Sequence, residues 1–168
     1  AAKRGFQANG ADIPIMMSSH NGLPASGGAL GGLDQLEGDY EAYGMAVAAD
    51  EDTPARQFYE TLAADYGLEA PWNVVTAMGI SQGLYTVAVI GHAIEENGAE
   101  GLTGEKVREA LFAQPITAEE TQGFLPTLTF TPDAPFPLKG LQVNVGTVKD
   151  GKITIEATGV DVPDVKKW

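Results

Sequence analysis

A long stretch without charged side chains constrains this chain more than any other feature of its sequence. Residues 73–94 contain no Asp, Glu, Lys or Arg, and they are apolar on nearly every face of a helix. The polar side chains of Ser81, Gln82 and His92 interrupt the run, which argues against the span of about 20 apolar residues that crosses a bilayer. We therefore expect a buried helix over residues 73–97 of a globular fold, and no membrane insertion.

Three glycines lie inside this predicted helix. Gly79, Gly83 and Gly91 each weaken the helix by up to about 1 kcal/mol relative to Ala. We expect these positions to admit the close approach of another backbone, which would offset that cost.

The remaining pattern alternates short apolar runs with capped helices. Thr53 and Thr103 are N-cap residues that predict helices from Pro54 up to Gly67 and over 103–112. The turn at 149–151, between two alternating runs, predicts a hairpin. The other expected elements are a helix ending at Gly10, a buried parallel strand over 13–17, a loop with at most one short helical turn over 24–38, and strands over 40–48, 127–131, 141–148 and 152–157.

The charge balance excludes several classes of partner. The net charge is −13, from 23 acidic and 10 basic residues, whereas nucleic-acid binding needs clustered Lys and Arg. The same balance argues against binding to anionic membrane surfaces. The absence of cysteine excludes disulfides, thiol nucleophiles and Cys-based metal sites.

Four ordered strings cover nearly the whole chain: IPIMMSSHNGL, YGMAVAADEDTPARQFYETLAADYG, SQGLYTVAVIGHAIEENGAEGLTGEKVREAL and FLPTLTFTPDAPFPLKGLQVNVGTVKDGKI. In this order they resemble the second half of the type I periplasmic solute-binding proteins. These proteins are receptors of ABC importers for branched-chain amino acids, amides, urea and aromatic acids. The ordered set carries the resemblance, because the family is defined by pattern and not by one signature motif.

The resemblance implies an α/β fold: the type I periplasmic-binding-protein fold in part, as a C-terminal half that contributes to both Rossmann-like lobes. Residues 1–48 are then part of the second lobe, residues 49–125 part of the first, and residues 126–168 return to the second lobe with a terminal β-hairpin. The N-terminal half of such a protein has no counterpart here, and the opening helix lacks an N-terminal cap. We therefore expect a missing N-terminal segment as a partner; the alternative is an independent domain.

A polar loop is the leading candidate for a ligand site, because open α/β sheets bind ligands beyond the carboxyl ends of their strands. Ser18, Ser19, His20 and Asn21 directly follow a predicted parallel strand. In amino-acid binders of the family, the corresponding loop commonly supplies an acid for the ligand ammonium, and this loop has none. We therefore expect a small polar solute, with an amide or an aromatic carboxylate favoured over an amino acid. The serines and His20 could equally bond their own turn.

Further positions complete the expected ligand-binding set. Ala48 would lie at a crossover between the lobes, and Ser81 and Gln82 could reach the cleft from the first lobe. His92 is more simply a satisfied core or surface histidine. The acidic run 50–52 is more simply a solvated helix start than a calcium site.

No catalytic constellation opposes a binding role. A serine-hydrolase interpretation of Ser-Ser-His lacks the G-x-S-x-G elbow, and two distant histidines make no zinc set. We expect a periplasmic or lipid-anchored extracytoplasmic receptor, without cofactor, metal or catalytic residue. It would capture a small solute by lobe closure and deliver it to an ABC permease. The alternatives are a cytoplasmic ligand-sensing regulator of the same fold and, less favoured, a hydrolase dependent on His20.

Overall fold

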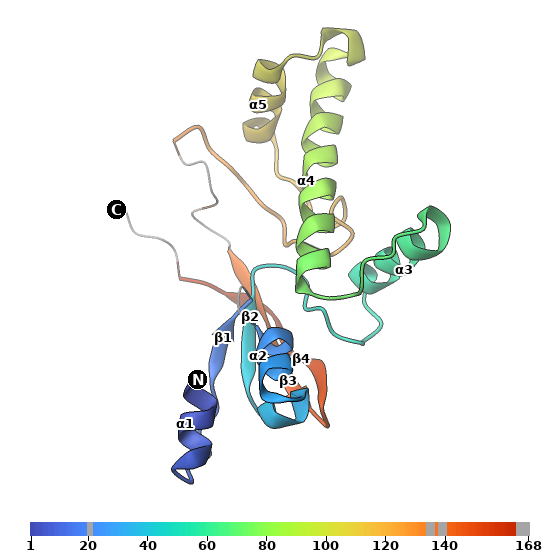
Figure 1. Cartoon of the computed structure of the whole chain (residues 1–168). Coiled ribbons are helices and arrows are strands. Elements are labelled where there is room, and N and C mark those ends of the chain that lie inside the picture. Colours follow the sequence, from blue (N-terminus) through green and yellow to red (C-terminus); the bar gives the residue numbers. More distant parts are fainter. Residues whose placement is uncertain (20–21, 134–136, 138–140, 164–168) are drawn as a thin grey trace.

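The computed structural model of the protein describes all residues except 20–21, 134–136, 138–140 and 164–168. Helices and strands follow one another along the chain in an order that separates a sheet from a group of helices (Figure 1). The elements are α1 (Ala2–Ala8), β1 (Met16–Ser18), α2 (Leu23–Leu30), the 3-10 helix η1 (Leu33–Leu36), β2 (Tyr40–Tyr43), α3 (Pro54–Tyr66), α4 (Val74–Asn97), the 3-10 helix η2 (Ala99–Gly101), α5 (Gly104–Ala113), β3 (Gln142–Lys149) and β4 (Lys152–Asp161).

The strands form one mixed sheet in the order β1-β2-β3-β4. β1 pairs with β2 in parallel, and the pairs β2–β3 and β3–β4 are antiparallel. The predicted terminal hairpin is confirmed. Its turn residues Asp150 and Gly151 have φ values of 51° and 68°, the positive values that a two-residue hairpin turn of type I′ requires.

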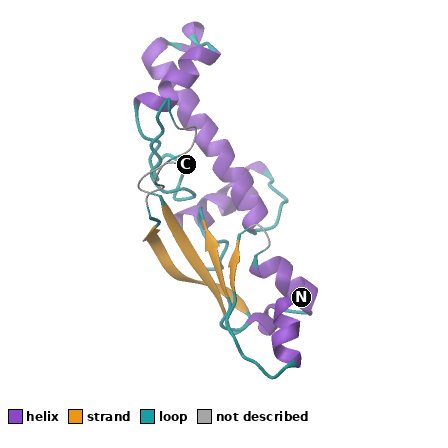
Figure 2. Ribbon diagram, turned by 90° about the vertical axis from the view of Figure 1, so that its left-hand side faces the viewer, coloured by secondary structure: helices purple, strands orange, loops and turns teal. Residues whose placement is uncertain are grey.

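A hydrophobic core joins α2 and η1 to one face of this sheet (Figure 2). Leu23 and Leu36 are buried against Tyr43 of β2 and Val148 of β3. Gly146 of β3 leaves room for the Tyr43 ring of the adjacent strand, because a Cβ there would lie 3.0 Å from that ring. The expected loop over 24–38 is therefore wrong in its first part: burial of Leu23 and Leu30 stabilises a helix in this glycine-rich segment, which begins with Pro at a favourable position.

The helices α3, α4 and α5 have the boundaries that their caps predict. The side-chain oxygens of Thr53 and Thr103 accept hydrogen bonds from the backbone N–H groups of Arg56 and Lys106 at 3.2 and 3.3 Å. Gly67 ends α3 in the left-handed conformation. Two small cores pack these helices, one around Phe124 and one around Ile116 and Phe130.

The prediction that the long apolar helix is buried is wrong for this chain. Among the described residues, α4 packs on one side, through Ala77, Ala88 and Val89, while Val75 and Val87 are each 68% exposed. By length and composition α4 could cross a membrane, and 17% of its most apolar 18-residue window is buried. The hydrophobic pattern of a sequence shows that a helix is apolar. It does not show whether another helix or strand is available to bury that helix.

The predicted backbone approach at the helix glycines is also wrong within the described part of the chain. A Cβ added at Gly79, Gly83 or Gly91 would have no atom within 4 Å. These glycines lie on or beside the half of α4 that packs against nothing described.

Three strand predictions differ from the structure. The run 13–17 forms a strand only from Met16, and that strand is an edge strand whose Met16 is 60% exposed. The run 40–48 pairs only as far as Tyr43, because the chain then leaves the sheet. The run 127–131 forms no strand in the described part of the chain, and its Leu128 makes an isolated antiparallel bridge with Ile116.

Candidate functional site

The predicted polar loop lies at the carboxyl end of β1. Ser18 is the last residue of the strand and is exposed, and the half-buried Ser19 donates its backbone N–H to the Ala42 carbonyl oxygen of β2 at 3.2 Å. His20 and Asn21, the other two predicted ligand residues of this loop, lie outside the described residues.

After these residues the chain enters α2. A side chain of β2 binds the backbone at the N-terminus of that helix. Glu41 is fully buried. Its Oε2 accepts the backbone N–H of Leu23 at 2.7 Å and the hydroxyl of Tyr43 at 2.6 Å. Burial raises the pKa of the Glu41 carboxyl above its usual value, and the two donated hydrogen bonds act in the opposite direction. Burial and the adjacent carboxylate raise the pKa of the Tyr43 hydroxyl.

A second buried carboxylate, Asp39, lies immediately before β2, two residues before Glu41. Asp39 Oδ1 accepts from Lys3 Nζ and from the backbone N–H of Ile15, each at 2.9 Å. Asp39 is fully buried and the Lys3 side chain is 10% exposed. This ion pair fixes α1 to the sheet. Beside it, a cavity of about 420 Å³ lies between α1, β1 and α2, and Ser18 contributes to its lining.

The segment after β2 crosses from the sheet to the helices, and backbone contacts hold it in place. Ala46 donates its N–H to the carbonyl oxygen of Phe124 at 2.8 Å. The Asn144 side chain of β3 donates to the carbonyl oxygen of Met45, also at 2.8 Å. Ala48, which was predicted to lie at a crossover, is found in this segment and is 9% exposed. A cavity of about 230 Å³ lies here, between the crossover, α3 and β3.

The two predicted residues of α4 differ in their availability. Ser81 is 3% exposed, and its hydroxyl donates to the Met78 carbonyl oxygen of its own helix at 2.8 Å. Gln82 is exposed. No contact among the described residues joins either side chain to Ser18 or Ser19, so the structure does not bring the predicted set together in this chain.

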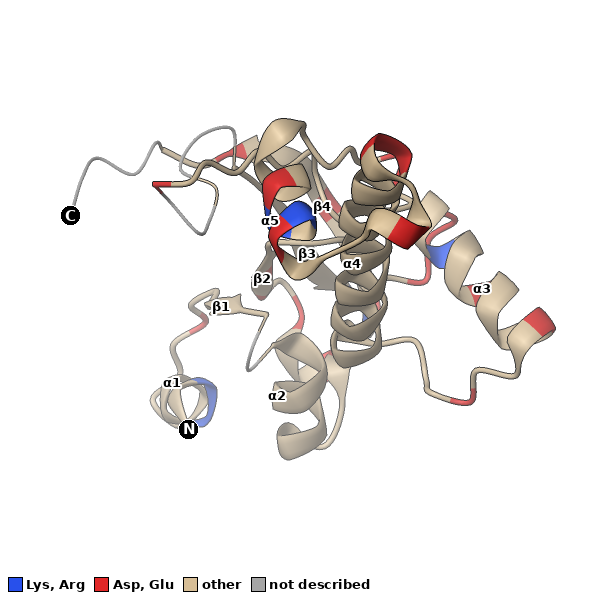
Figure 3. Cartoon of the chain, turned by 90° about the horizontal axis from the view of Figure 1, so that it is seen from above, with Lys and Arg blue, Asp and Glu red and all other residues tan. Residues whose placement is uncertain are grey.

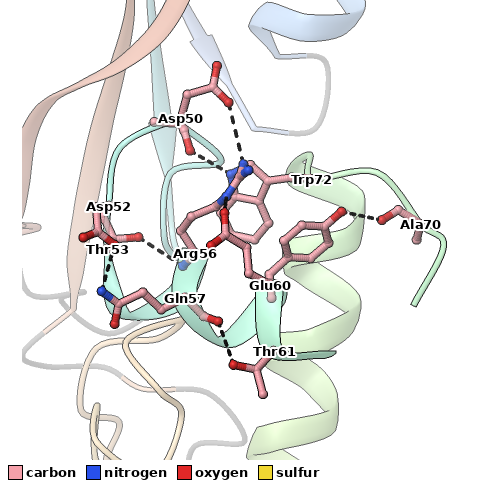
Figure 4. Close-up of polar contacts among 11 residues, drawn as sticks. Asp50, Asp52, Thr53, Arg56, Gln57, Glu60, Thr61, Ala70 and Trp72 are labelled. Carbon is pink, nitrogen blue, oxygen red and sulfur yellow. Dashed lines mark hydrogen bonds and ion pairs between the residues drawn. The ribbon is translucent and has the colours of Figure 1, made fainter. Parts of the chain in front are cut away.

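Polar and aromatic contacts around Arg56 tie the crossover to α3 (Figure 4). The guanidinium pairs with Glu60 at 2.7 Å and Asp50 at 3.6 Å, and it lies 5.6 Å from the ring centroids of Tyr59 and Trp72. The charged groups of this cluster pair with one another, so the cluster has a structural role.

The acidic run at 50–52 is engaged in contacts within the chain. Asp52 accepts from the Gln57 side chain at 2.8 Å, and Glu51 accepts from the backbone N–H of Ile155 in β4 at 2.7 Å. The run therefore links α3 and the hairpin, which is more than a solvated helix start. Within the described part of the chain, no group of three His, Cys, Asp or Glu side chains is placed to hold a metal ion.

His92 has a partner, which the sequence did not identify. Its Nε2 contacts Glu120, while Nδ1 is buried without a partner among the described residues. Glu120 also accepts from the backbone N–H and the hydroxyl of Thr117, each at 2.7 Å. These Thr117 bonds, followed by His92, lower the pKa of the Glu120 carboxyl. The contact joins α4 to the chain that follows α5.

The charge distribution agrees with the composition. Acidic residues are spread over helices and loops, whereas Lys and Arg are confined to a few places (Figure 3), one of which is the adjacent pair Lys3 and Arg4 of α1. A basic surface for a polyphosphate chain is not formed by the residues that the structure describes.

Sequence analysis missed the residues that hold the site in place. Glu41 and Asn144 are polar residues in strands, Asp39 immediately precedes β2, and the two acids are fully buried. A signal was available, because Glu41 and Tyr43 alternate along β2 and so share the face that carries the apolar core.

Comparison with known proteins supports the fold. No protein-family model and no curated protein matches the sequence. Over 95% of its length the chain is similar to a solved structure described as an ABC transporter permease from the Pseudomonas fluorescens group, with a TM-score of 0.71 and 17% identity. Over 94% it is similar to a branched-chain amino acid ABC transporter from Thermus thermophilus with bound valine, with a TM-score of 0.62 and 18% identity.

These similarities define a mixed α/β fold shared with components of ABC transport systems. The chain spans 40% and 41% of the length of these two proteins. At these sequence identities the similarity concerns the fold alone and does not establish the function of this chain.

Proposed function

We propose that this chain is part of an extracytoplasmic solute-binding protein of an ABC importer, with the type I periplasmic-binding-protein fold. The observation that carries the proposal is the segment from Ser19 to Leu23. It follows a parallel strand at its carboxyl end, where α/β folds bind ligands, and both of its ends are fixed to β2. The solved structures of similar fold, both described as ABC transport components, support the same assignment.

The lobe assignment follows the separation of sheet and helices. All four strands come from residues 16–43 and 142–161, which we place in the second lobe with the rest of 1–48 and 126–168. The helices α3, α4 and α5 lie within 49–125, and none of the sheet's strands does. We place this region in the first lobe.

The exposed face of α4 supports a partner segment outside this sequence. Val75, Val87 and Ile94 are exposed on α4 in the described part of the chain, and exposed apolar side chains gathered on one helix mark an interaction surface. We propose that an N-terminal segment of the same protein covers this face and completes the first lobe.

The mechanism requires binding and no catalysis. A small polar solute (an amino acid, an amide or an aromatic carboxylate) contacts both lobes, and the free energy of those contacts favours the closed form. Ser18 and Ser19 provide hydroxyl groups from the second lobe, with His20 and Asn21 beside them in sequence. Gln82 provides an exposed amide from the first. The closed form then delivers the solute to an ABC permease.

A thermal-shift screen of the full chain tests the proposal. The probes are L-leucine, L-valine, acetamide and benzoate, and a probe at a hundredfold excess over its Kd stabilises the protein by about 2.7 kcal/mol. Acetamide or benzoate is expected to act more strongly than the amino acids. Ser19→Ala should weaken the response, whereas Thr61→Ala on the exposed side of α3 should not. Turnover of a bound amide or ester would contradict a pure binding role.

A further inference from the structure

A side chain of the sheet holds the place where the chain passes between sheet and helices. The chain leaves the sheet after β2 and returns to it after α5. These two passages are bonded to each other, because the Ala46 N–H donates to the Phe124 carbonyl oxygen at 2.8 Å. At the residue before Ala46, the Met45 carbonyl oxygen accepts from Asn144 Nδ2 of β3, also at 2.8 Å. Asn144 therefore binds the sheet to the point where the two passages meet.

The same amide also holds an irregular part of β4. The register of β3 and β4 shifts between Val143 and Val145, so that β4 has one residue more than β3 there, which is a β-bulge. Gly159 lies in this bulge with a φ of 63°, in the left-handed region that favours glycine. Its N–H donates to Asn144 Oδ1 at 3.0 Å. The oxygen of the amide thus binds the bulge, and its nitrogen binds the crossover after β2.

Only one orientation of the Asn144 amide satisfies both contacts. Met45 presents a carbonyl oxygen, which needs a donor, and Gly159 presents an N–H, which needs an acceptor. An amide supplies one group of each kind, whereas a carboxylate supplies acceptors alone. The residue type at position 144 is therefore matched to its two partners.

Two cavities border this amide. One, of about 230 Å³, lies between Asn144, the crossover and the start of α3, and the other, of about 190 Å³, lies between Asn144, Leu125 and Pro126. Close packing makes protein interiors resistant to movement. The space beside Asn144 leaves the crossover room to shift once its hydrogen bond to the sheet is broken.

We propose that Asn144 is a positioning residue for lobe closure, because its amide fixes the crossover to the sheet and so sets the orientation of the helices relative to the sheet. Hinges of closing proteins are short segments that absorb changes in backbone angles. A hydrogen bond to such a segment favours one arrangement of the parts that it connects. The consequence for lobe closure rests on the proposed function, and Asn144 does not need to touch the solute.

A purely local role for Asn144 makes a different prediction. If the amide served the bulge alone, its loss would affect the Gly159 N–H and leave the crossover unchanged. The positioning role requires that its loss also weaken the bond between Ala46 and Phe124, in which Asn144 takes no part. The Ala46 amide therefore separates the two roles.

Hydrogen–deuterium exchange of the full chain provides the test. Asn144→Asp keeps an acceptor for Gly159 and removes the donor to Met45. Exchange of the Ala46 amide should accelerate about tenfold in this variant, while exchange of the Gly159 amide should stay within about twofold of the wild type. Asn144→Ala removes both groups and should accelerate exchange at both amides.

Thr147→Val is the matched control. The Thr147 hydroxyl, on the same strand, donates to the Asp39 carbonyl oxygen at 2.9 Å, so this variant also loses one hydrogen bond from a side chain to a distant backbone carbonyl. Both variants should be less stable than the wild type, and they are compared at urea concentrations that give them equal stability. Equal acceleration at Ala46 in Thr147→Val and Asn144→Asp would overturn the positioning role, as would unchanged Ala46 exchange in both Asn144 variants.

A second measurement follows the orientation of the helices directly. Because the chain has no cysteine, Glu96→Cys on α4 and Lys152→Cys on β4 place spin labels at two exposed positions. The distribution of distances between the labels should be about twofold broader in Asn144→Asp than in the wild type and unchanged in Thr147→Val. An unchanged width in Asn144→Asp would contradict the positioning role.

The same labels test the proposed function separately. Lobe closure on a solute predicts that L-valine, acetamide or benzoate shifts the distance between the labels in the wild type. If none of these probes shifts the distance while the Asn144 variants respond as expected, the proposed function fails and the anchoring of the crossover by Asn144 stands.

Discussion

Asn144 Nδ2 donates a hydrogen bond of 2.8 Å to the carbonyl oxygen of Met45, across 99 residues of sequence. The Oδ1 atom of the same side chain accepts the Gly159 N–H at 3.0 Å. One amide therefore joins β3, β4 and the crossover that follows β2. The neighbouring bond from Ala46 to the carbonyl oxygen of Phe124 brings the chain that follows α5 to the same point.

Removal of this amide should loosen the crossover. Asn144→Ala leaves the Met45 carbonyl without its donor, and such a loss costs about 1–3 kcal/mol in the free energy of unfolding. Urea denaturation measures the change. Gln142→Ala is the control on the same strand, because its amide contacts Asp161 at the surface and its loss should cost less than about 0.5 kcal/mol.

The buried ion pair between Lys3 and Asp39 should be sensitive to removal of one partner. Lys3→Met leaves an uncompensated buried carboxylate and should destabilise the chain by about 3 kcal/mol. Adding Asp39→Asn to Lys3→Met should recover part of that loss, as a double-mutant cycle by chemical denaturation will show. Arg4→Met, which removes an exposed contact to Ala29, should have little effect. An equally large effect of Arg4→Met would contradict this account.

Glu41 should make stability fall as the pH rises. Because its pKa is raised in the folded state, the neutral carboxyl contributes stability that is complete below the ordinary value of 4.5. That stability is lost as the pH rises through the folded-state pKa. Glu41→Gln should therefore gain stability relative to the wild type as the pH rises above the ordinary value of 4.5, as measured by melting temperature. A constant difference across this range would exclude the titration.

Glu120 should have the opposite pH dependence. Its pKa is lowered by Thr117 and His92, so its contribution is present above the ordinary value of 4.5 and is lost as the pH falls through the folded-state pKa. Glu120→Gln should destabilise the chain at pH 7 and have a smaller effect at pH 3. Glu119→Gln, at an exposed neighbouring position, should show no such difference in acid titrations followed by circular dichroism.

The uncovered face of α4 should bind hydrophobic dyes in the isolated chain. Val75→Glu combined with Val87→Glu should reduce dye fluorescence without lowering stability by more than about 0.5 kcal/mol, because both side chains are exposed. Thr61→Glu on α3 serves as the charge-matched control for one substitution. A large loss of stability in the double variant would show that this face is covered within the chain itself.

Local features were predictable from the sequence because they depend on neighbouring residues. The caps at Thr53 and Thr103 and the turn at Asp150 lie where their side-chain and backbone chemistry places them. The placement of Ser18 and Ser19 at the end of a parallel strand was predictable for the same reason.

Features that depend on distant partners were not predictable. The glycine-rich α2 is helical because a sheet residue, Glu41, caps it and a core buries Leu23. The exposure of Val87 depends on which helices or strands lie beside α4. The hydrophobic pattern of the sequence does not contain that information. In the sequence, Asp39 and Glu41 resemble solvent-facing residues, because the backbone N–H groups that they bind belong to other segments of the chain.

The N-terminal end of α4 lies beside the crossover that follows β2, so movements there are transmitted along the helix. Val74 packs against the sheet-side core, and Trp72 Nε1 donates to the Ala49 carbonyl oxygen at 2.7 Å. The helix extends from that point as a lever of about 36 Å, at 1.5 Å per residue. A tilt of about 10° at the pivot would sweep its far end through about 6 Å, so small adjustments among a few crossover hydrogen bonds are converted into large displacements at the tip.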